Sequence, residues 1–138
     1  IDEDTYRIES FAGNANTHIK ELVLPDTLKI IGNYAFENCS KLKSVYIPKS
    51  VNYIGNNIFH GCSVLEHIEV DNDNTVYDSR KSCNAIIETS RDKMIAACTN
   101  TLITDDVVDI ANEVKNEYSD DEFSEMYPDY ENFNWYDA

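Results

Sequence analysis

The sequence is short of basic side chains. It has 11 lysines and arginines against 26 aspartates and glutamates, which gives its 138 residues a net charge of −15. A protein this acidic repels nucleic-acid phosphates and anionic lipid head groups, so neither is an expected partner, whereas a basic patch on another protein is. No apolar run approaches the roughly 18 residues that cross a bilayer, so no membrane insertion is expected. Glycine and proline are scarce too, four and three residues, and the composition is that of one small folded domain.

Self-similarity is the strongest feature that the sequence does have. Residues 19–41 align without gaps on residues 42–64, and the start of a third copy follows at residue 65. A period of this length is typical of stacked repeats rather than of a conventional globular core. The equivalent apolar positions are Ile19/Leu42/Leu65, Leu22/Val45/Ile68, Leu24/Ile47/Val70, Leu28/Val51, Ile31/Ile54, Phe36/Phe59 and Cys39/Cys62.

The spacing within each copy indicates the local structure. Alternating apolar residues at 22–24 and 45–47 predict short strands with one buried face, and Pro25 and Pro48 end them. Gly32 and Gly55 are expected at tight bends. One coil cannot bury its own apolar face, but stacked coils can, with their strands paired in parallel. We therefore predict a leucine-rich-repeat solenoid with coils of about 23 residues.

The pattern continues beyond the two complete copies. Ile8 takes the place of Ile31 in an N-terminal half coil, and Ile103, Val107 and Ile110 resume the apolar spacing later. The repeats are interrupted between Val70 and Ile103. There, residues 85–89 and 93–97 flank a polar turn and predict a β-hairpin inserted at about 71–101. The expected organisation is a solenoid over residues 1–110 and an acidic, aromatic-rich cap and tail over residues 111–138.

One motif runs from Ile31 to Pro48: Ile-Gly-x-x-Ala-Phe-x-x-Cys-Ser-x-Leu-x-x-Val-x-Ile-Pro. It recurs from Ile54, with Ile58 in place of the alanine and with Ile68, Val70 and Asp71 at its last three specified positions. It closely resembles the BspA-like leucine-rich repeats of bacterial surface proteins. The segment around residues 77–87 is similar to the hairpin that many members insert. The resemblance covers about residues 8–110. It implies a secreted or surface-attached protein that binds host proteins, other bacteria or matrix components, and it brings no catalytic residues.

No set of residues in the sequence forms a convincing chemical site. The cysteines lack metal-ligand spacing, so structural thiols are favoured, with a Cys83–Cys98 disulfide left open. A nucleophile needs a base and an orienting group within reach, which the repeat register does not provide for the three histidines. Residues 71–74 (Asp-Asn-Asp-Asn) predict a turn rather than an EF-hand calcium loop, with a weak calcium site left open. We expect no enzyme, no cofactor and no metal. The histidines are His18, His60 and His67.

The strands leave a row of side chains on their outer face. Val23, Tyr46 and Glu69 fall at equivalent positions in successive coils and point away from the core. Rigid, extended sheet faces suit flat contacts, and tyrosine is a common interface anchor. The row is one candidate protein-binding site, although Val and Tyr also favour strands without any ligand.

The C-terminal tail is the second candidate. After Lys115 the sequence has eight acidic residues, no basic residue and seven of its fifteen aromatic residues. Residues 105–118 predict a helix with one apolar face, which would cap the open end of the solenoid. Pro128 prevents one helix from running through, so the remainder is interpreted as a segment that binds a basic groove. The candidate residues are Phe123, Tyr127, Tyr130, Phe133, Trp135 and Tyr136.

Two functions follow from these features. The first is a non-catalytic protein-binding or adhesion module of a secreted or cell-surface bacterial protein. The second is an acidic inhibitor or mimic whose tail occupies a basic site on a target protein. Binding through the tail would weaken steeply as salt rises, whereas binding through the sheet face need not.

Overall fold

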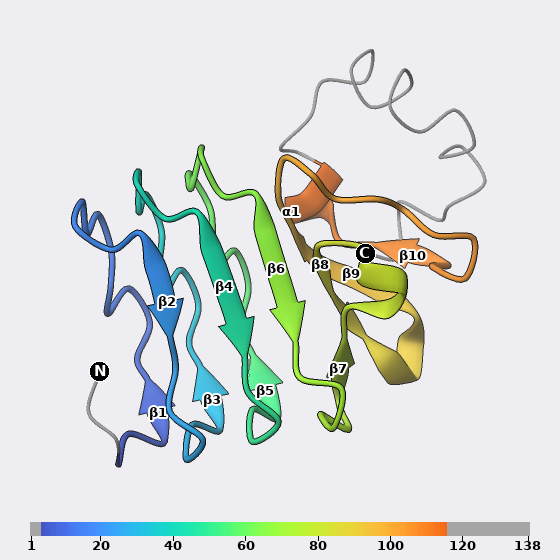
Figure 1. The fold of residues 1–138 in the computed structure, drawn as a ribbon, viewed down its shortest axis with the longest axis horizontal. Coiled ribbons are helices and arrows are strands. Elements are labelled where there is room, and N and C mark those ends of the chain that lie inside the picture. Colours follow the sequence, from blue (N-terminus) through green and yellow to red (C-terminus); the bar gives the residue numbers. More distant parts are fainter. Residues whose placement is uncertain (1–3, 116–138) are drawn as a thin grey trace.

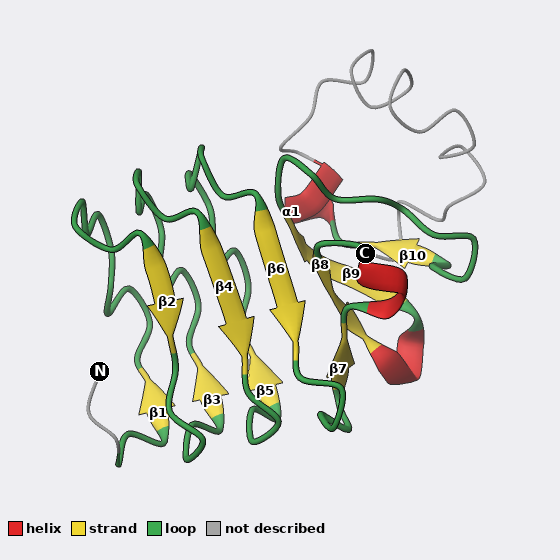
Figure 2. Ribbon diagram, viewed as in Figure 1, coloured by secondary structure: helices red, strands yellow, loops and turns green. Residues whose placement is uncertain are grey.

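The computed structural model describes residues 4–115 and consists of two rows of parallel strands closed at one end by a third sheet (Figures 1 and 2). The first row is β2 (Glu21–Val23), β4 (Ser44–Ile47) and β6 (His67–Val70). The second row is β1 (Arg7–Ile8), β3 (Ile30–Ile31) and β5 (Tyr53–Ile54). Each coil contributes one strand to each row.

In each row, paired residues of neighbouring strands are one repeat apart in the sequence. Glu21 pairs with Ser44, and Ser44 pairs with His67, each one repeat further along the chain. In the second row Ile8 pairs with Ile31, which pairs with Ile54. The predicted parallel pairing is therefore confirmed, including the N-terminal half coil. Because equivalent residues stack, the core is a set of columns running along the stack.

Those columns hold the apolar repeat positions. Leu28, Ile31 and Leu42 are fully shielded from solvent, and Val45 and Val51 are nearly so. Since apolar residues of one coil are covered by those of the next, each coil depends on its neighbours for its core. The same cluster also contains Leu22, Leu24, Ala35, Phe36, Cys39, Ile47, Ile54, Ile58, Phe59, Leu65, Ile68 and Val70.

The repeated glycines have a different role from the one expected. Neither Gly32 nor Gly55 has a positive φ among the described residues, so neither makes a left-handed bend. A side chain at Gly32 would instead place its Cβ 2.5 Å from the backbone nitrogen of Ser10 in the preceding coil, and one at Gly55 would lie 2.7 Å from that of Asn33. Glycine is needed there because the backbones of adjacent coils approach closely.

The inserted segment forms a sheet of its own. β8 (Ala85–Glu88) and β9 (Lys93–Ala97) pair antiparallel across a 3₁₀ turn at Thr89–Arg91, as the sequence predicted. β7 (Tyr77–Asp78) joins one edge and β10 (Asp109–Ile110) the other. A second 3₁₀ turn, Arg80–Ser82, connects β7 to β8.

Both faces of this sheet are buried. Ile86, Ala96 and Cys98 join the core of the coils, so this face closes the stack. The opposite face packs against the chain that follows the hairpin. Burial on both faces explains why the hairpin strands are almost continuously apolar instead of alternating. The second cluster comprises Cys83, Ala85, Ile87, Met94, Ala97, Val107, Ile110, Ala111 and Val114.

The helix predicted over residues 105–118 is wrong for most of its described length. Asp109–Ile110 is a strand that pairs in parallel with Lys93–Met94, and helix α1 covers only Asn112–Lys115. The apolar spacing was that of a partial coil: the Val107 amide bonds to the Thr104 carbonyl, as Leu28 bonds to Pro25 in the first coil. Residues 116–118 lie outside the described part of the chain.

Candidate functional site

The outer face of β2–β4–β6 carries the predicted row. Val23 lies beside Tyr46, and Tyr46 beside Glu69, in the strand register that the repeats imply. The Val23 side chain is 75% exposed and Tyr46 is 44% exposed, so an aliphatic and an aromatic surface adjoin in the middle of the sheet. Leu22, Val45 and Ile68 point the other way and fix the row by their burial. The structure thus brings these three predicted residues together.

Tyr46 is held in place by a contact that the sequence did not reveal. Its hydroxyl donates a hydrogen bond of 2.9 Å to Asp71 Oδ2. This bond to the carboxylate raises the pKa of Tyr46 above its usual value. The pKa of Asp71 is lowered, first by the Asp73 amide that bonds to its other oxygen and then by Tyr46. The ring is therefore a fixed aromatic surface bordered by a carboxylate that stays ionised.

A shallow pocket of about 390 Å³ lies over this face. Lys20, Lys43 and Glu66 are exposed and form another row across the coils, one position before β2, β4 and β6. Glu69 and Asp71 make the surface beside β6 acidic. A partner surface that matches it would place apolar atoms over Val23 and Tyr46 and donors or positive charge opposite the two carboxylates. The pocket is lined by Glu21, Leu22, Val23, Leu24, Ser44, Val45, Tyr46, His67 and Glu69.

The other residues singled out in the sequence do not form a reactive centre. His18, His60 and His67 are all exposed. Within residues 4–115 no group of three or more His, Cys, Asp or Glu side chains is placed to hold a metal ion. Asn74 is buried in the predicted turn, where its side-chain Nδ2 donates to the carbonyls of Pro48 and Val51. No helix of this part of the chain is long and apolar enough to span a membrane.

None of the four cysteines forms a disulfide, so the Cys83–Cys98 pairing left open by the sequence is not present. Cys39 Sγ donates to the Gly13 carbonyl at 3.2 Å, and Cys62 Sγ repeats the contact with Phe36 at 3.1 Å, so each thiol ties its coil to the preceding one. Burial raises the pKa of the Cys39 thiol and, to about 11, that of Cys83. Both therefore remain protonated at neutral pH.

We expect Cys39 to resist alkylation in the folded protein, because the thiolate is the reactive form and this thiol is both buried and harder to deprotonate. Its labelling at pH 7.5 should be at least about tenfold slower than after unfolding in guanidinium. Peptide mapping by mass spectrometry after timed labelling measures the rate at each cysteine. Equally fast labelling of Cys39 in the native and unfolded chain would contradict its place in the core.

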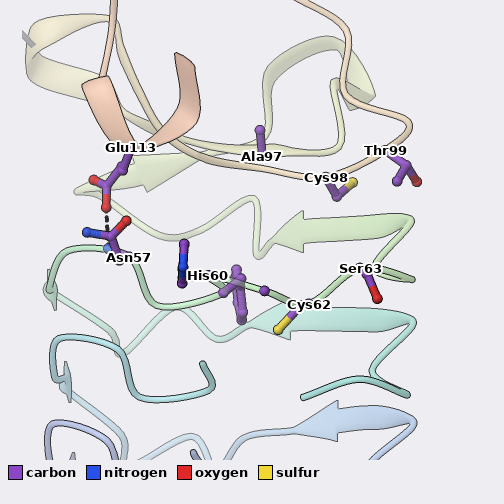
Figure 3. A pocket seen from close by; sticks show the side chains of 10 residues that line it. Asn57, His60, Cys62, Ser63, Ala97, Cys98, Thr99 and Glu113 are labelled. Carbon is purple, nitrogen blue, oxygen red and sulfur yellow. Dashed lines mark hydrogen bonds between the residues drawn. The ribbon is translucent and has the colours of Figure 1, made fainter. Parts of the chain in front are cut away.

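A second hollow, of about 380 Å³, lies where the third coil meets β9 (Figure 3). Its walls include His60 and Cys62 from the coil and Cys98 and Thr99 from the end of the hairpin. Glu113 of α1 reaches its edge, where its carboxylate accepts a hydrogen bond from the Asn57 amide. Burial raises the pKa of Glu113. Reasoning from the sequence missed this contact, because Glu113 and Asn57 are 56 residues apart.

The predicted tail residues Phe123, Tyr127, Tyr130, Phe133, Trp135 and Tyr136 lie outside the described part of the chain. The described part has what defines a leucine-rich-repeat protein: short parallel strands that recur once in every repeat and bury columns of aliphatic side chains. The chain matches the BspA-type leucine-rich repeat region over residues 1–101 and belongs to that family.

Solved structures show the same fold. The chain is similar to a leucine-rich cell surface protein from Faecalibacterium prausnitzii, with 23% identity and a TM-score of 0.70, over 83% of this chain and 31% of that one. It is also similar to a leucine-rich repeat protein from Eubacterium ventriosum (26% identity, TM-score 0.56, 67% and 25% covered). A third similar structure is the pneumococcal vaccine antigen PcpA, with 21% identity and a TM-score of 0.60, over 82% of this chain and 35% of that one. The chain thus spans about a quarter to a third of these structures. A comparison with the curated proteins finds no match.

Proposed function

We propose that this chain is a non-catalytic protein-binding module of a bacterial cell-surface protein, and that its partner binds the outer face of β2–β4–β6. The observation that carries the proposal is the row Val23–Tyr46–Glu69, in which an exposed aromatic ring is held by Asp71. An ordered ring loses little conformational freedom on binding, which is what makes tyrosine an effective anchor. The similarity to a cell surface protein of F. prausnitzii supports the location.

The acidic border narrows the chemistry of the partner. Glu69 and Asp71 stand on the β6 side of the ring, and the whole chain carries a net charge of −15. A partner with lysine or arginine opposite these carboxylates gains attraction during encounter and pairs with them once bound. We infer a partner that combines an apolar contact for Val23 and Tyr46 with a basic rim.

We expect Tyr46→Ala to weaken partner binding by about 10- to 100-fold, since it removes the only aromatic anchor of the row. The partner is first isolated on the wild-type chain from matrix and bacterial-surface extracts, then purified, and its Kd is measured by calorimetry. Tyr53→Ala is the matched control. Tyr53 is 55% exposed but lies on β5, in the other row, so its loss should change the Kd less than twofold.

Two outcomes would contradict the proposal. If Tyr46→Ala and Tyr53→Ala bind as the wild type does, the face is not the site. If affinity instead falls steeply between about 0.05 and 0.5 M salt and disappears when residues 116–138 are removed, the acidic tail binds the partner, as an inhibitor or mimic would. Binding by the sheet face predicts that such a truncation retains most of the affinity.

A further inference from the structure

The coils are tied together by backbone hydrogen bonds on the side opposite β2–β4–β6. Three amides of the first coil donate to carbonyls of the second, and the equivalent three amides of the second donate to the third. Within each set, both the donating amides and the accepting carbonyls belong to every second residue. The pairs are Phe11–Asn33, Gly13–Ala35, Ala15–Glu37, Tyr34–Asn56, Phe36–Ile58 and Asn38–His60, at 2.7–3.0 Å.

The third coil has the same three amides, and within residues 4–115 no fourth coil receives them. The Asn57 amide donates to the Glu113 carboxylate, which replaces the missing carbonyl. Within residues 4–115, the amides of Phe59 and Gly61 donate no hydrogen bond. Phe59 is only 5% exposed, and an unpaired amide in such a place costs about 1–3 kcal/mol. Buried amides are almost always paired, so the Phe59 amide calls for an acceptor, whereas Gly61 is exposed and its amide is open to a partner.

Other polar groups at this end of the stack do have partners. The Ile54 amide donates to the Tyr77 hydroxyl at 2.9 Å, and the Val70 amide donates to Ser79 Oγ at 3.0 Å. The Leu65 carbonyl accepts from both the amide and the hydroxyl of Thr99. The inserted sheet thus closes the end of the stack with substitute partners. Within residues 4–115, the Phe59 and Gly61 amides have no such substitute partner, and both residues line the hollow beside Glu113.

The hollow has the form of a place for one more strand of backbone. The hollow, of about 380 Å³, lies between the third coil and Ala97–Thr99. Glu113 already accepts the hydrogen bond from the first of the three amides, that of Asn57. By analogy with the two preceding interfaces, the ligand that fits is a peptide segment with two backbone carbonyls two residues apart. A carboxylate is less suitable, because the neighbouring Glu113 would repel it.

We propose that a segment of residues 116–138 occupies this hollow, with two of its backbone carbonyls accepting hydrogen bonds from Phe59 and Gly61. The chain itself points to this occupant: α1 brings Glu113 to the edge of the hollow, and the described chain ends two residues later. The stretch 116–138 is as long as one coil, such as 19–41, and its aromatic side chains can cover Phe59. This inference is independent of the proposed function of the β2–β4–β6 face.

Photo-crosslinking tests the occupant directly. p-Benzoylphenylalanine replaces Ser63, which lines the hollow, or Ser40, its equivalent in the second coil, where the amides are already paired. We expect irradiation of the dilute full-length protein to join position 63 to a peptide from residues 116–138 within one molecule, and position 40 to give at least about tenfold less of that product. Equal yields, or no crosslink to this segment, would overturn the proposal. Crosslinked dimers would assign the hollow to a second copy.

Amide exchange measured by NMR supplies a second, independent readout. In the full-length chain, the Phe59 and Gly61 amides should exchange at least about 100-fold more slowly than in an unstructured peptide, as Phe36 and Asn38 do. A protease site inserted after Lys115 then allows the tail to be cut from the folded protein and removed. Protection should be lost at Phe59 and Gly61 and kept at Phe36 and Asn38.

Three exchange results would refute the docked tail: fast exchange at both amides in the full chain, protection that survives removal of the tail, or protection that disappears on dilution. If removal of the tail also abolishes the protection of the Phe36 and Asn38 amides, the chain has unfolded. In that case the crosslink from position 63 in the full-length protein determines whether the tail occupies the hollow.

Discussion

Phe36→Ala should lower the free energy of unfolding by about 3–5 kcal/mol, because it removes a ring that is buried in a column of the core. Phe36 is 3% exposed, and its ring lies 6.3 Å from that of Phe59, with an angle of 21° between the planes. On its other side the ring covers Gly13, where any Cβ would come within 2.8 Å of Phe36 Cδ1. Removing it would leave a cavity between the first and third coils.

Phe59→Ala should cost a similar amount, toward the lower end of that range, because one side of Phe59 faces the hollow beside Glu113. Phe11→Ala is the matched control. Its ring also stacks, on Tyr34 at 5.0 Å, but it is 51% exposed, so the expected loss is about 0.5–1.5 kcal/mol. Urea unfolding followed by circular dichroism measures all three. Losses below about 1 kcal/mol for both core rings would show that they are not in the core.

The sequence was informative wherever a residue recurs with the period of the repeat. Alignment of the copies placed Val45 on Leu22 and Tyr46 on Val23, and the parallel register then required the first pair to be buried and the second to be exposed. A side chain's direction alternates along a strand, so a correct register determines the face of every residue. This is why the exposed row could be predicted from the sequence, whereas the protein that binds to it could not.

Prediction failed where the period is interrupted. Val107, Ile110, Ala111 and Val114 satisfy both a helical spacing and the end of a coil, and spacing alone cannot separate the two. The presence of β9 beside Asp109 and Ile110 decided for a strand. That neighbour is distant in sequence, and its position depends on how the whole hairpin packs against the stack.

The contacts that complete the candidate sites were hidden for the same reason. Asp71 fixes Tyr46 from 25 residues away, and Glu113 meets Asn57 from 56 residues away. Each joins a repeat position to a residue outside the repeat, so no internal comparison of coils reveals it. The unpaired amides of Phe59 and Gly61 within residues 4–115 are visible only when the hydrogen bonds of successive coils are compared in three dimensions.

Arg80→Met should destabilise the inserted sheet by about 2–4 kcal/mol, because it removes the charge that three carboxylates share. The Arg80 side chain is 15% exposed and lies 2.7 Å from both Asp78 Oδ2 and Asp92 Oδ1, and 3.7 Å from Asp106 Oδ2. Without it Asp78 stays partly buried with no cation beside it. Methionine keeps the apolar stem, so the loss reports the charge and the hydrogen bonds rather than packing.

The effect should depend on pH in a defined direction. Burial acts to raise the pKa of Asp78, but the hydrogen bonds from Arg80 and Thr89 outweigh it, so the pKa is lower in the folded chain than in the unfolded one. Such a group stabilises the fold above its unfolded pKa, about 3.9, and this stabilisation is lost as pH falls through the lower folded value. The difference between the wild type and Arg80→Met should therefore be full at pH 6 and shrink below about pH 4.

Arg91→Met is the control for this experiment. Arg91 is 53% exposed and lies 3.7 Å from Glu88, a mostly solvated pair expected to contribute at most about 0.5 kcal/mol at any pH. Urea unfolding at pH 6, 4 and 3 gives the free energies for both variants and the wild type. Losses from Arg80→Met that equal those from Arg91→Met at pH 6, or that do not change with pH, would show that Arg80 does not hold the β7–β8 turn to the loop before β10. The expected result is a large, acid-sensitive loss from Arg80→Met alone, because Arg80 joins carboxylates from three separate segments of the inserted sheet and Arg91 meets one.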